Sequence, residues 1–543
     1  MLTKIYSAAI SGIDAFPVTI ETEIWKGAGF TIVGMADTSI RESYERMLSA
    51  IRHSGYEFPH HRITINLAPA DIKKEGAQFD LPMAIGILTS AEFVRPADLS
   101  SSMLTGELSL DGSVLPVKGV LPMAIKAREM GLKRLIVPEG NVTEAAVVNK
   151  IDVYGVKTLQ EAVDILEGSS DLSPVRIDTR ALFFASQEEF DYDFSEVKGQ
   201  ESVKRAFEIG CAGGHNLIMV GPPGAGKSMM AKRLPSIMPP LSMAEALETT
   251  KIHSVAGKLS RGSMLMTKRP FRTPHHTVSP VALVGGGANP MPGEISLAHT
   301  GVLFLDEFPE FPRQVLEVLR QPIEDRIITV ARAKYTVNYP SSFMLVASMN
   351  PCPCGYYGHP TRPCTCTPGA VSKYVNRISG PLLDRIDLQV EIEPVAFDDM
   401  ADPTPTEPSA SIRERVMKAR EIQQERYREI KEIHCNAQMN SRLLKRYAWP
   451  DSEGMAKLKD RMTKLNMSAR AFDRILRVAR TIADLESASE IISSSQEKAS
   501  SLSQEKSSLS LQQAALRPVL VRHIAEAISY RALDRGSYGS TFG

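Results

Sequence analysis

The chain contains the stretch Gly221-Pro222-Pro223-Gly224-Ala225-Gly226-Lys227-Ser228, which decides its fold and its chemistry. Two glycines separated by four residues and followed by Lys-Ser are the pattern of a phosphate-binding loop. The glycines let backbone N–H groups close around the β- and γ-phosphates, Lys227 adds a positive charge, and the Ser228 hydroxyl can hold Mg²⁺. The apolar run 217–220 before the loop predicts a buried strand, and the run 229–234 after it contains good helix formers. A strand, a tight turn and a helix N-terminus make an anion site, so we expect ATP and Mg²⁺ to bind here.

The length and the charge of the chain limit the classes of protein to which it can belong. With 543 residues it is too long for a single core, and about two to four domains are expected. Its 63 basic and 63 acidic residues cancel, so any contact with nucleic acid must be local. The sequence has no apolar run of about 18 residues and no signal peptide, which predicts a cytoplasmic protein without a membrane partner. Its six cysteines are then expected to be reduced or metal-bound.

The succession of strand and helix patterns predicts an α/β protein in four parts. Residues 1–170 mix short apolar strands with helices, and residues 171–192 have the composition of a weakly structured connector. Residues 193–396 form the nucleotide-binding core. Residues 397–543 begin with a Pro-rich linker and continue with a charged, helical pattern.

One segment of the C-terminal part differs from its surroundings in composition. Residues 487–513 are rich in Ser, Gln, Glu and Lys, and Ser495-Gln496-Glu497-Lys498 recurs as Ser503-Gln504-Glu505-Lys506. This composition predicts a disordered or loosely helical insertion between two helices. We expect this segment to be a tolerated surface insertion without a function of its own.

Two further strands carry polar residues at their ends. The apolar run Gly301–Leu305 ends in Asp306 and Glu307. The first carboxylate can orient the Mg²⁺ shell and the second can polarise the attacking water, although solvated acids at the tip of a buried strand are the alternative. The strand pattern 343–349 ends in Asn350, whose amide can help to place that water, while Asn is also common in turns.

These three strands, in this order, resemble the AAA+ ATPases. The resemblance assigns Asp306 and Glu307 to the Walker B pair and Asn350 to sensor 1. In the AAA+ branch that contains magnesium chelatase, a Leu-Leu-Asp-Arg element carries the arginine finger, which implies this role for Arg385. A finger acts on the γ-phosphate of a neighbouring subunit, so the resemblance implies a ring. The alternative for Arg385 is a surface ion pair with Asp384 or Asp387.

A second arginine is assigned by the same resemblance. Ser468-Ala469-Arg470 opens an amphipathic helix that is similar to the sensor 2 helix of the AAA+ lid domain. Arg470 is therefore the expected sensor 2 arginine. Arg474 and Arg477 are the substitutes if Arg470 does not take this role.

Nearly the whole chain, apart from the Ser/Gln-rich insertion, resembles the YifB/ComM family of Mg-chelatase-like ATPases. The most specific stretches are Arg272-Thr273-Pro274-His275-His276-Thr277 and Met349-Asn350-Pro351-Cys352-Pro353-Cys354-Gly355. The resemblance implies a hexameric, cytoplasmic DNA translocase that promotes branch migration during recombination and uptake of transforming DNA. The alternatives are a chelatase-like ATPase that remodels a protein partner, and a nucleotide-dependent scaffold without activity.

The N-terminal part resembles a Lon protease domain that has lost its chemistry. Residues 74–80 and 105–117 carry the resemblance. Lon-type hydrolysis needs a Ser nucleophile activated by a Lys, but these positions fall on Gln78 and near Leu121. An amide cannot be the nucleophile and Leu cannot be the base. We therefore expect a catalytically inactive domain that serves assembly or DNA engagement.

Four cysteines lie close together in the sequence. Cys352-Pro353-Cys354 and Cys364-Thr365-Cys366 form two Cys-x-Cys pairs among Gly and Pro residues, which suits a tetrahedral Zn²⁺ site. The spacing within each pair is shorter than usual, His359 is an alternative ligand, and free thiols in a loop are the alternative to a metal. Cys211 and Cys435 are isolated and are expected to be packing residues.

Two insertions between the ATPase elements are candidates for binding DNA. Residues 254–294 include Lys268, Arg269 and Arg272. Residues 324–339 predict a β-hairpin whose basic tip holds Arg332 and Lys334. In the related helicases, hairpins at these places project into a central pore, where basic side chains contact phosphates. A solvated turn is the alternative for the hairpin.

Overall fold

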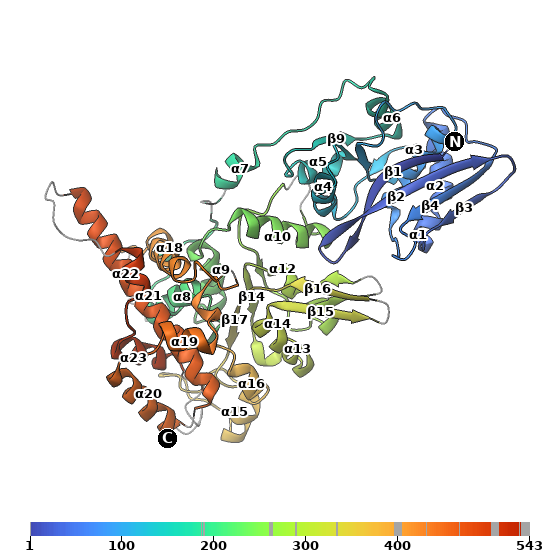
Figure 1. Cartoon of the computed structure of the whole chain (residues 1–543). Coiled ribbons are helices and arrows are strands. Elements are labelled where there is room, and N and C mark those ends of the chain that lie inside the picture. The colour runs from blue at the N-terminus through green and yellow to red at the C-terminus, as the bar shows by residue number, and fades with distance from the viewer. Residues whose placement is uncertain are drawn as a thin grey trace.

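The computed structural model describes residues 2–185, 187, 190–259, 264–287, 290–332, 335–395, 404–430, 432–465, 467–500, 510–531 and 533. These residues form an N-terminal α/β unit, a central α/β unit and a C-terminal helical unit (Figure 1). The mixed α/β fold class that the sequence predicts is confirmed. Within the described ranges, no helix is long and apolar enough to cross a membrane.

The N-terminal unit is built on a seven-stranded mixed sheet in the order β3-β4-β2-β1-β5-β8-β9. Along β1, Ile5 and Ala9 pack on the side of α2 and α3, while Ala8 between them packs on the side of α4. This alternation follows from the period of two in a strand, and it buries β1 on both faces. The sheet strands are β1 (Leu2–Ser11), β2 (Asp14–Trp25), β3 (Phe30–Val33), β4 (Arg62–Ala68), β5 (Ser102–Leu104), β8 (Arg134–Pro138) and β9 (Asp152–Val156). A separate pair is β6 (Glu107–Leu108) with β7 (Val114–Leu115), and the helices are α1 (Thr38–Arg41), α2 (Ser43–His53), α3 (Asp80–Ser90), α4 (Val120–Glu129), α5 (Val142–Ala145) and α6 (Leu159–Glu167).

The central unit contains a five-stranded parallel sheet in the order β11-β14-β17-β10-β18. Three of its strands are fully buried, as the continuous apolar runs in the sequence predict for a parallel sheet covered on both faces. The strands are β10 (Leu217–Val220), β11 (Phe271–Arg272), β14 (Val302–Leu305), β17 (Met344–Met349) and β18 (Leu388–Glu391), with α8 (Glu201–Gly213), α9 (Lys227–Ile237), α10 (Met243–Val255), α11 (Pro280–Val284), α12 (Glu294–Leu297), α13 (Arg313–Glu317), α14 (Arg320–Asp325), α15 (Pro368–Val375) and α16 (Gly380–Leu383).

Both predicted insertions of the central unit contain short strand pairs. The first holds β12 (Gly285–Gly286) and β13 (Met291–Pro292), and the second is the antiparallel hairpin of β15 (Ile327–Arg332) and β16 (Tyr335–Pro340). The two insertions lie against each other, because the Tyr339 hydroxyl donates to the carbonyl oxygen of Pro290 at 2.7 Å. The hairpin projects from the central unit toward one side of the molecule (Figure 1).

The C-terminal unit consists of helices that pack against α8 and against one another. Its longest helix, α21, corrects the predicted start of the Ser/Gln-rich insertion. Residues 487–495 belong to this 32-residue helix, and Ser487 and Ala488 are fully buried, because the apolar stripe of the helix continues through them. Residues 501–509 lie outside the described part. The helices are α18 (Ser409–Arg426), α19 (Ser441–Tyr447), α20 (Ser452–Leu465), α21 (Ala469–Ser500), α22 (Leu511–Ala515) and α23 (Val521–Ser529).

The connector between the first two units is more structured than the sequence suggests. It contains α7 (Thr179–Ala185), whose Phe183 is buried against Leu241 and Ala246. The N-terminal unit also contacts the core directly through the β1–β2 turn. A Cβ placed on Gly12 would lie 3.0 Å from Cγ1 of Val337 in the hairpin, and Lys251 Nζ pairs with Asp14 at 2.8 Å.

Candidate functional site

The phosphate loop lies at the carboxyl end of β10 and leads into α9. Gly224 and Gly226 have φ values of +79° and +82°, which glycine adopts without strain. Lys227 begins the helix, and its Nζ donates to the carbonyl oxygens of Gly221 (2.6 Å) and Pro222 (2.8 Å) and to Oδ1 of Asn350 (3.1 Å). Two carbonyl oxygens of the loop and the amide oxygen of Asn350 therefore hold the Lys227 ammonium in a fixed position.

The environment of Lys227 makes its charge sensitive to a bound anion. Burial lowers the pKa of Lys227 to about 8, although the carboxylates of Asp306 and Glu307 act in the opposite direction. Phosphate oxygens beside the ammonium would restore the pKa toward its ordinary value. An anionic ligand in the loop would thus supply the negative charge that stabilises the protonated form of Lys227.

Asp306 connects the second strand to the phosphate loop. It follows β14, and its Oδ2 accepts a hydrogen bond from the Ser228 hydroxyl at 2.6 Å. Its Oδ1 accepts from the hydroxyl of Ser348, which is in β17. A hydroxyl and a carboxylate side by side can share the coordination of Mg²⁺ with the phosphates. Sequence reasoning missed Ser348, whose signal is a small polar residue near the end of a buried apolar strand.

Glu307 stands beside a histidine to which the sequence analysis gave no role. Its side chain is 57% exposed, and its backbone has a φ of +53°, which is uncommon for a residue with a side chain. His276 Nδ1 lies 3.4 Å from Glu307 Oε2, and the His276 ring packs against that of His275 with centroids 4.1 Å apart. The Arg272–Thr277 stretch therefore reaches the carboxylate that is expected to polarise water.

Arg385 lies at the opposite edge of the sheet from the phosphate loop. It precedes β18, whereas the loop follows β10, and four residues of strand separate the two edges by about 13 Å. Its side chain is buried and pairs with Glu324 at 2.9 Å, and it donates to the carbonyl oxygen of Pro381 at 2.7 Å. The predicted alternative partners, Asp384 and Asp387, are not its ion-pair partners among the described residues.

Arg470 is exposed near the same edge of the sheet. It lies in the first turn of α21, where the hydroxyl of Ser468 is 3.5 Å from Asp384 Oδ2. Together with Arg326, Arg474 and Arg477 it lines a cavity of about 490 Å³. Glu324, the partner of Arg385, lines this cavity as well. The two candidate arginines therefore share one side of the unit, away from the nucleotide loop of their own chain.

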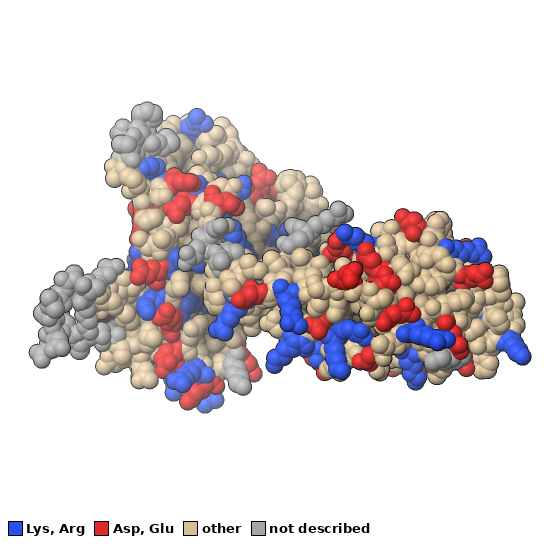
Figure 2. Space-filling view, turned by 90° about the horizontal axis from the view of Figure 1, so that it is seen from above, with Lys and Arg blue, Asp and Glu red and all other residues tan. Residues whose placement is uncertain are grey.

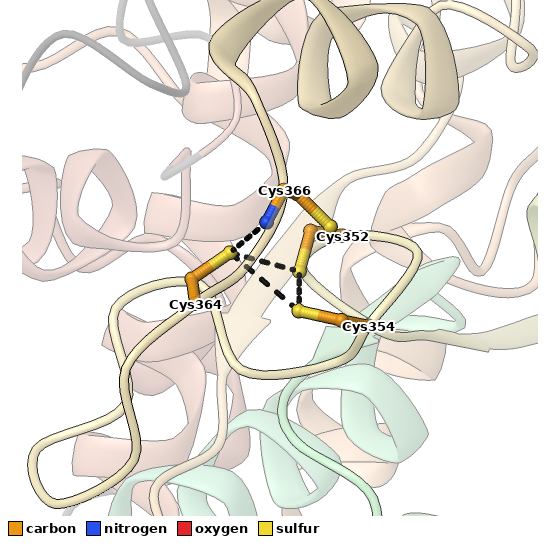
Figure 3. Close-up of side chains that lie close together, drawn as sticks. All are labelled: Cys352, Cys354, Cys364 and Cys366. Atoms are coloured by element: carbon orange, nitrogen blue, oxygen red, sulfur yellow. Dashed lines mark hydrogen bonds between the residues drawn. The ribbon is translucent and has the colours of Figure 1, made fainter.

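The four cysteines come together between β17 and α15 (Figure 3). The Sγ atoms of Cys352 and Cys354 are 3.3 Å apart, and Cys364 lies 3.7 Å from the first and 3.5 Å from the second. All four Sγ atoms, including that of Cys366, lie within 4.8 Å of one another. A Zn–S bond of about 2.3 Å in a tetrahedron requires S···S separations of about 3.8 Å, so the four thiols fit this metal.

The surroundings of the cysteines select among the alternatives for ligands. Backbone N–H groups of Tyr356 and Thr365 lower the pKa of Cys354 to about 5, whereas burial raises the pKa of Cys364 to about 12. Cys354 is therefore favoured as the thiolate that a metal needs, and Cys364 would lose its proton on binding the metal. His359 is not part of the cluster, because its Nδ1 accepts from the N–H groups of residues 361 and 362 at 3.2 Å and 3.1 Å. Cys211 and Cys435 are buried away from the four.

The candidate DNA-contacting residues have different environments. Arg269 is largely buried and donates to the carbonyl oxygens of Pro239, Pro240 and Thr300, so it cannot reach a phosphate in this conformation. Arg272 forms a two-pronged pair with Glu294 at 2.7 Å and 2.9 Å.

Of the other three candidates, Lys268 is the one whose side chain the structure describes. Lys268 is exposed. The side chains of Arg332 and Lys334 lie outside the described part of the structure. Acidic and basic side chains are interspersed over the visible face of the molecule, with basic side chains along one edge of the N-terminal unit (Figure 2).

Neither position of the expected Lon dyad carries a group that could catalyse hydrolysis. Gln78 lies in a short 3₁₀ helix, where its carbonyl oxygen accepts from the N–H of Gly106 at 2.9 Å. Leu121 is fully buried in α4, and its N–H donates to Glu144 at 2.9 Å. The inactivity of this unit stays a prediction.

Comparison with protein families places each unit of the chain. The profile described as magnesium chelatase, subunit ChlI, matches residues 193–400. The profile described as subunit ChlI of Mg-chelatase matches residues 20–141, and the one for the ChlI C-terminal region matches residues 406–502.

Comparison with individual proteins extends the similarity over the full length. The YifB protein of Escherichia coli is 41% identical over 541 residues, which cover 98% of both chains. The competence protein ComM of Haemophilus influenzae is 39% identical over 540 residues, again 98% of both chains. Lon protease 2 of Bacillus subtilis is 34% identical over 141 residues, 24% of this chain and 25% of that protein. The chain therefore belongs to the YifB/ComM family of magnesium chelatase-like AAA+ ATPases, with a Lon-like N-terminal region.

Proposed function

We propose that this ATPase is a motor that acts on single-stranded or branched DNA as a homohexameric ring. Its action is branch migration in recombination, and a role in natural transformation is in keeping with the name of the competence protein ComM, to which it is similar over nearly its whole length. DNA in the cytoplasm is its partner.

The positions of the site residues support the roles that we propose for them. Lys227 and the backbone of residues 221–226 bind the phosphates, and Ser228 and Asp306 hold the Mg²⁺ that accompanies ATP. Glu307 polarises the attacking water, and Asn350, 3.1 Å from Lys227, positions it. The Cys352, Cys354, Cys364 and Cys366 thiolates hold a structural Zn²⁺.

A ring is supported by the distance between the two halves of the catalytic set. Arg385 and Arg470 lie at the sheet edge opposite the phosphate loop, so neither can reach the nucleotide of its own chain. In a ring, that edge would face the nucleotide of the next subunit. Arg385 would then leave Glu324 and stabilise the charge that develops on the γ-phosphate, and Arg470 would contact the same nucleotide.

The observation that carries a motor function is a cavity shared by Arg385 and the hairpin. This cavity, of about 510 Å³, is lined by Arg385 and Glu324 on one side and by Ile328 and Thr329 of β15 on the other. Val284, which precedes the β12 strand, also lines it. Movement of Arg385 from Glu324 to a phosphate of the neighbouring subunit would therefore change the packing of both insertions around this cavity.

The hairpin is the proposed DNA contact. Arg332 and Lys334 are near its tip, and exposed Lys268 in the first insertion is a further candidate, whereas Arg269 and Arg272 support the fold through intrachain contacts. The N-terminal unit touches the hairpin through Gly12 and is proposed to position it or to engage DNA itself, without proteolysis.

The test is the steady-state ATPase rate with and without single-stranded and four-way-junction DNA, measured beside Glu307→Gln. We expect DNA to stimulate the rate and Glu307→Gln to abolish it. The double variant Arg332→Ala/Lys334→Ala should weaken DNA binding and lower its salt dependence by about two phosphate contacts, with basal turnover retained. A rate that is indifferent to every DNA at low salt would refute the DNA motor and favour remodelling of a protein partner.

A further inference from the structure

The segment that carries the first two cysteines of the cluster lies directly against the phosphate loop. The carbonyl oxygen of Met349 accepts from the N–H of Gly221 at 3.2 Å, and the next residue, Asn350, accepts from Lys227. Two ligands of the cluster follow at positions 352 and 354. The segment 349–355 thus runs along the phosphate loop while it carries half of the cluster.

The contact closes at Gly355, directly after the second cysteine. A Cβ placed on Gly355 would lie 2.6 Å from Cδ and 2.7 Å from Cγ of Pro223, closer than such atoms approach. Gly355 also has a φ of +85°, and its N–H donates to the carbonyl oxygen of Cys352 at 3.0 Å. The backbone of the cysteine loop is therefore seated against the ring of a phosphate-loop proline.

The cysteine loop has little regular structure to hold it there. Between the end of β17 at Met349 and the start of α15 at Pro368, no helix or strand is formed. A loop of this length without secondary structure is uncommon in a compact domain, since ordering it costs conformational entropy. A cross-link between its two cysteine pairs would restrict the conformations of this loop, so that less ordering remains to be done when a nucleotide binds.

We propose that Zn²⁺ held by Cys352, Cys354, Cys364 and Cys366 is a structural part of the nucleotide site, because it fixes Asn350 and Gly355 against the phosphate loop. This inference rests on the ATP site and is independent of the action on DNA. The metal takes no part in hydrolysis. It sets the position of Asn350 beside Lys227 and of Gly355 beside Pro223, so a chain without zinc binds nucleotide less tightly.

A pair of glycine variants isolates the contact with the phosphate loop. Gly355 and Gly358 lie in the same loop and both have positive φ, +85° and +75°, but a Cβ on Gly358 meets no atom within 4 Å. Both Ala variants carry backbone strain of the same kind, since both positions have positive φ, and only Gly355→Ala displaces Pro223. We expect Gly355→Ala to weaken binding of a fluorescent ADP analogue about tenfold or more, against a change of about threefold or less in Gly358→Ala.

The metal is tested separately from the contact. Elemental analysis of the full chain should find about one Zn²⁺ per chain, retained in both glycine variants and lost in Cys364→Ser/Cys366→Ser. Removal of zinc with a chelator should weaken ADP-analogue binding, and re-addition of Zn²⁺, but not of Mg²⁺, should restore it while circular dichroism stays unchanged.

Three results would overturn the proposal. They are the absence of zinc from the purified protein, equal nucleotide affinity of the zinc-loaded and zinc-free chains, and equal effects of the two glycine substitutions. DNA is absent from every assay, so these failures are distinguishable from failure of the proposed motor function.

Discussion

Asp387 links the central sheet to the C-terminal unit, and replacing it should loosen that junction. Asp387 Oδ1 pairs with Arg474 of α21 at 2.9 Å, and Oδ2 accepts from the N–H of Asn216 at 2.9 Å. Burial alone would raise the pKa of Asp387, but the charge of Arg474 and the approach of His215 outweigh it and hold that pKa well below its usual range. The carboxylate is therefore ionised at neutral pH.

The expected cost of Asp387→Asn follows from the burial of the pair. Asn retains an oxygen for the N–H of Asn216, but it places a neutral NH2 group where the second oxygen accepted from Arg474. Arg474 then stays 12% exposed without its counterion. Breaking a buried pair from one side costs about 3–5 kcal/mol, and the residual exposure of Arg474 favours about 3 kcal/mol. With an m-value of about 3 kcal/mol per M, the urea midpoint of this unit should fall by about 1 M.

The sequence supplies a local probe for this experiment. The chain has two tryptophans, and Trp449 packs edge-on against Phe472, two residues before Arg474, with ring centroids 6.1 Å apart. In a Trp25→Phe background, the fluorescence of Trp449 reports unfolding of the C-terminal unit. Asp473→Asn serves as the matched control. It also removes a carboxylate from α21, and this carboxylate lines the cavity of Arg470, Arg474 and Arg477, as Asp387 does.

Two results would refute the reasoning. One is a midpoint for Asp387→Asn that equals that of Asp473→Asn. The other is a double variant Asp387→Asn/Arg474→Met that is no more stable than Asp387→Asn, because the cost would then not come from the uncompensated Arg474. The pH dependence has a definite sign as well. The depressed pKa contributes stability above the ordinary Asp pKa of about 3.9, and that contribution is lost as the pH falls through the lower, folded-state value.

Further predictions concern the nucleotide site. Burial lowers the pKa of Lys227 to about 8, and phosphate binds the charged form, so ADP affinity should fall as the pH rises above about 8. Calorimetry at about pH 8.5, in buffers of different ionisation heat, should show that ADP binding takes up roughly 0.7 proton. The absence of proton uptake would contradict this prediction. His276→Ala should lower kcat about tenfold by releasing Glu307 while ADP affinity is kept, and His275→Ala, whose Nδ1 contacts Thr277 instead, is the control. Arg385→Ala should abolish turnover without weakening ADP binding, and mixing it with Lys227→Ala should restore part of the rate in mixed rings; a weakened ADP affinity would place Arg385 at its own site.

Features that depend on neighbours in the sequence could be predicted from the sequence alone. The phosphate loop, the strand before it and the helix after it occupy one continuous stretch, so glycine spacing and apolar runs were sufficient to place them. The two strands that end in Asp306 and Asn350 and the hairpin were recognised from equally local patterns. The four cysteines were close enough in sequence for a shared site to be expected.

Features that depend on distant parts of the chain were decided only by the tertiary structure. Arg269 and Lys268 are adjacent, yet one is buried among carbonyl oxygens from other segments and the other is exposed. Arg385 pairs with Glu324 and not with the acids beside it in sequence. The seat of Gly355 on Pro223 joins residues 132 positions apart (355 − 223). The charge and the chemical type of a side chain belong to the residue itself and can be read from the sequence. Its burial and its hydrogen-bond and ion-pair partners depend on which distant segments the fold packs against it, and no local sequence pattern encodes them.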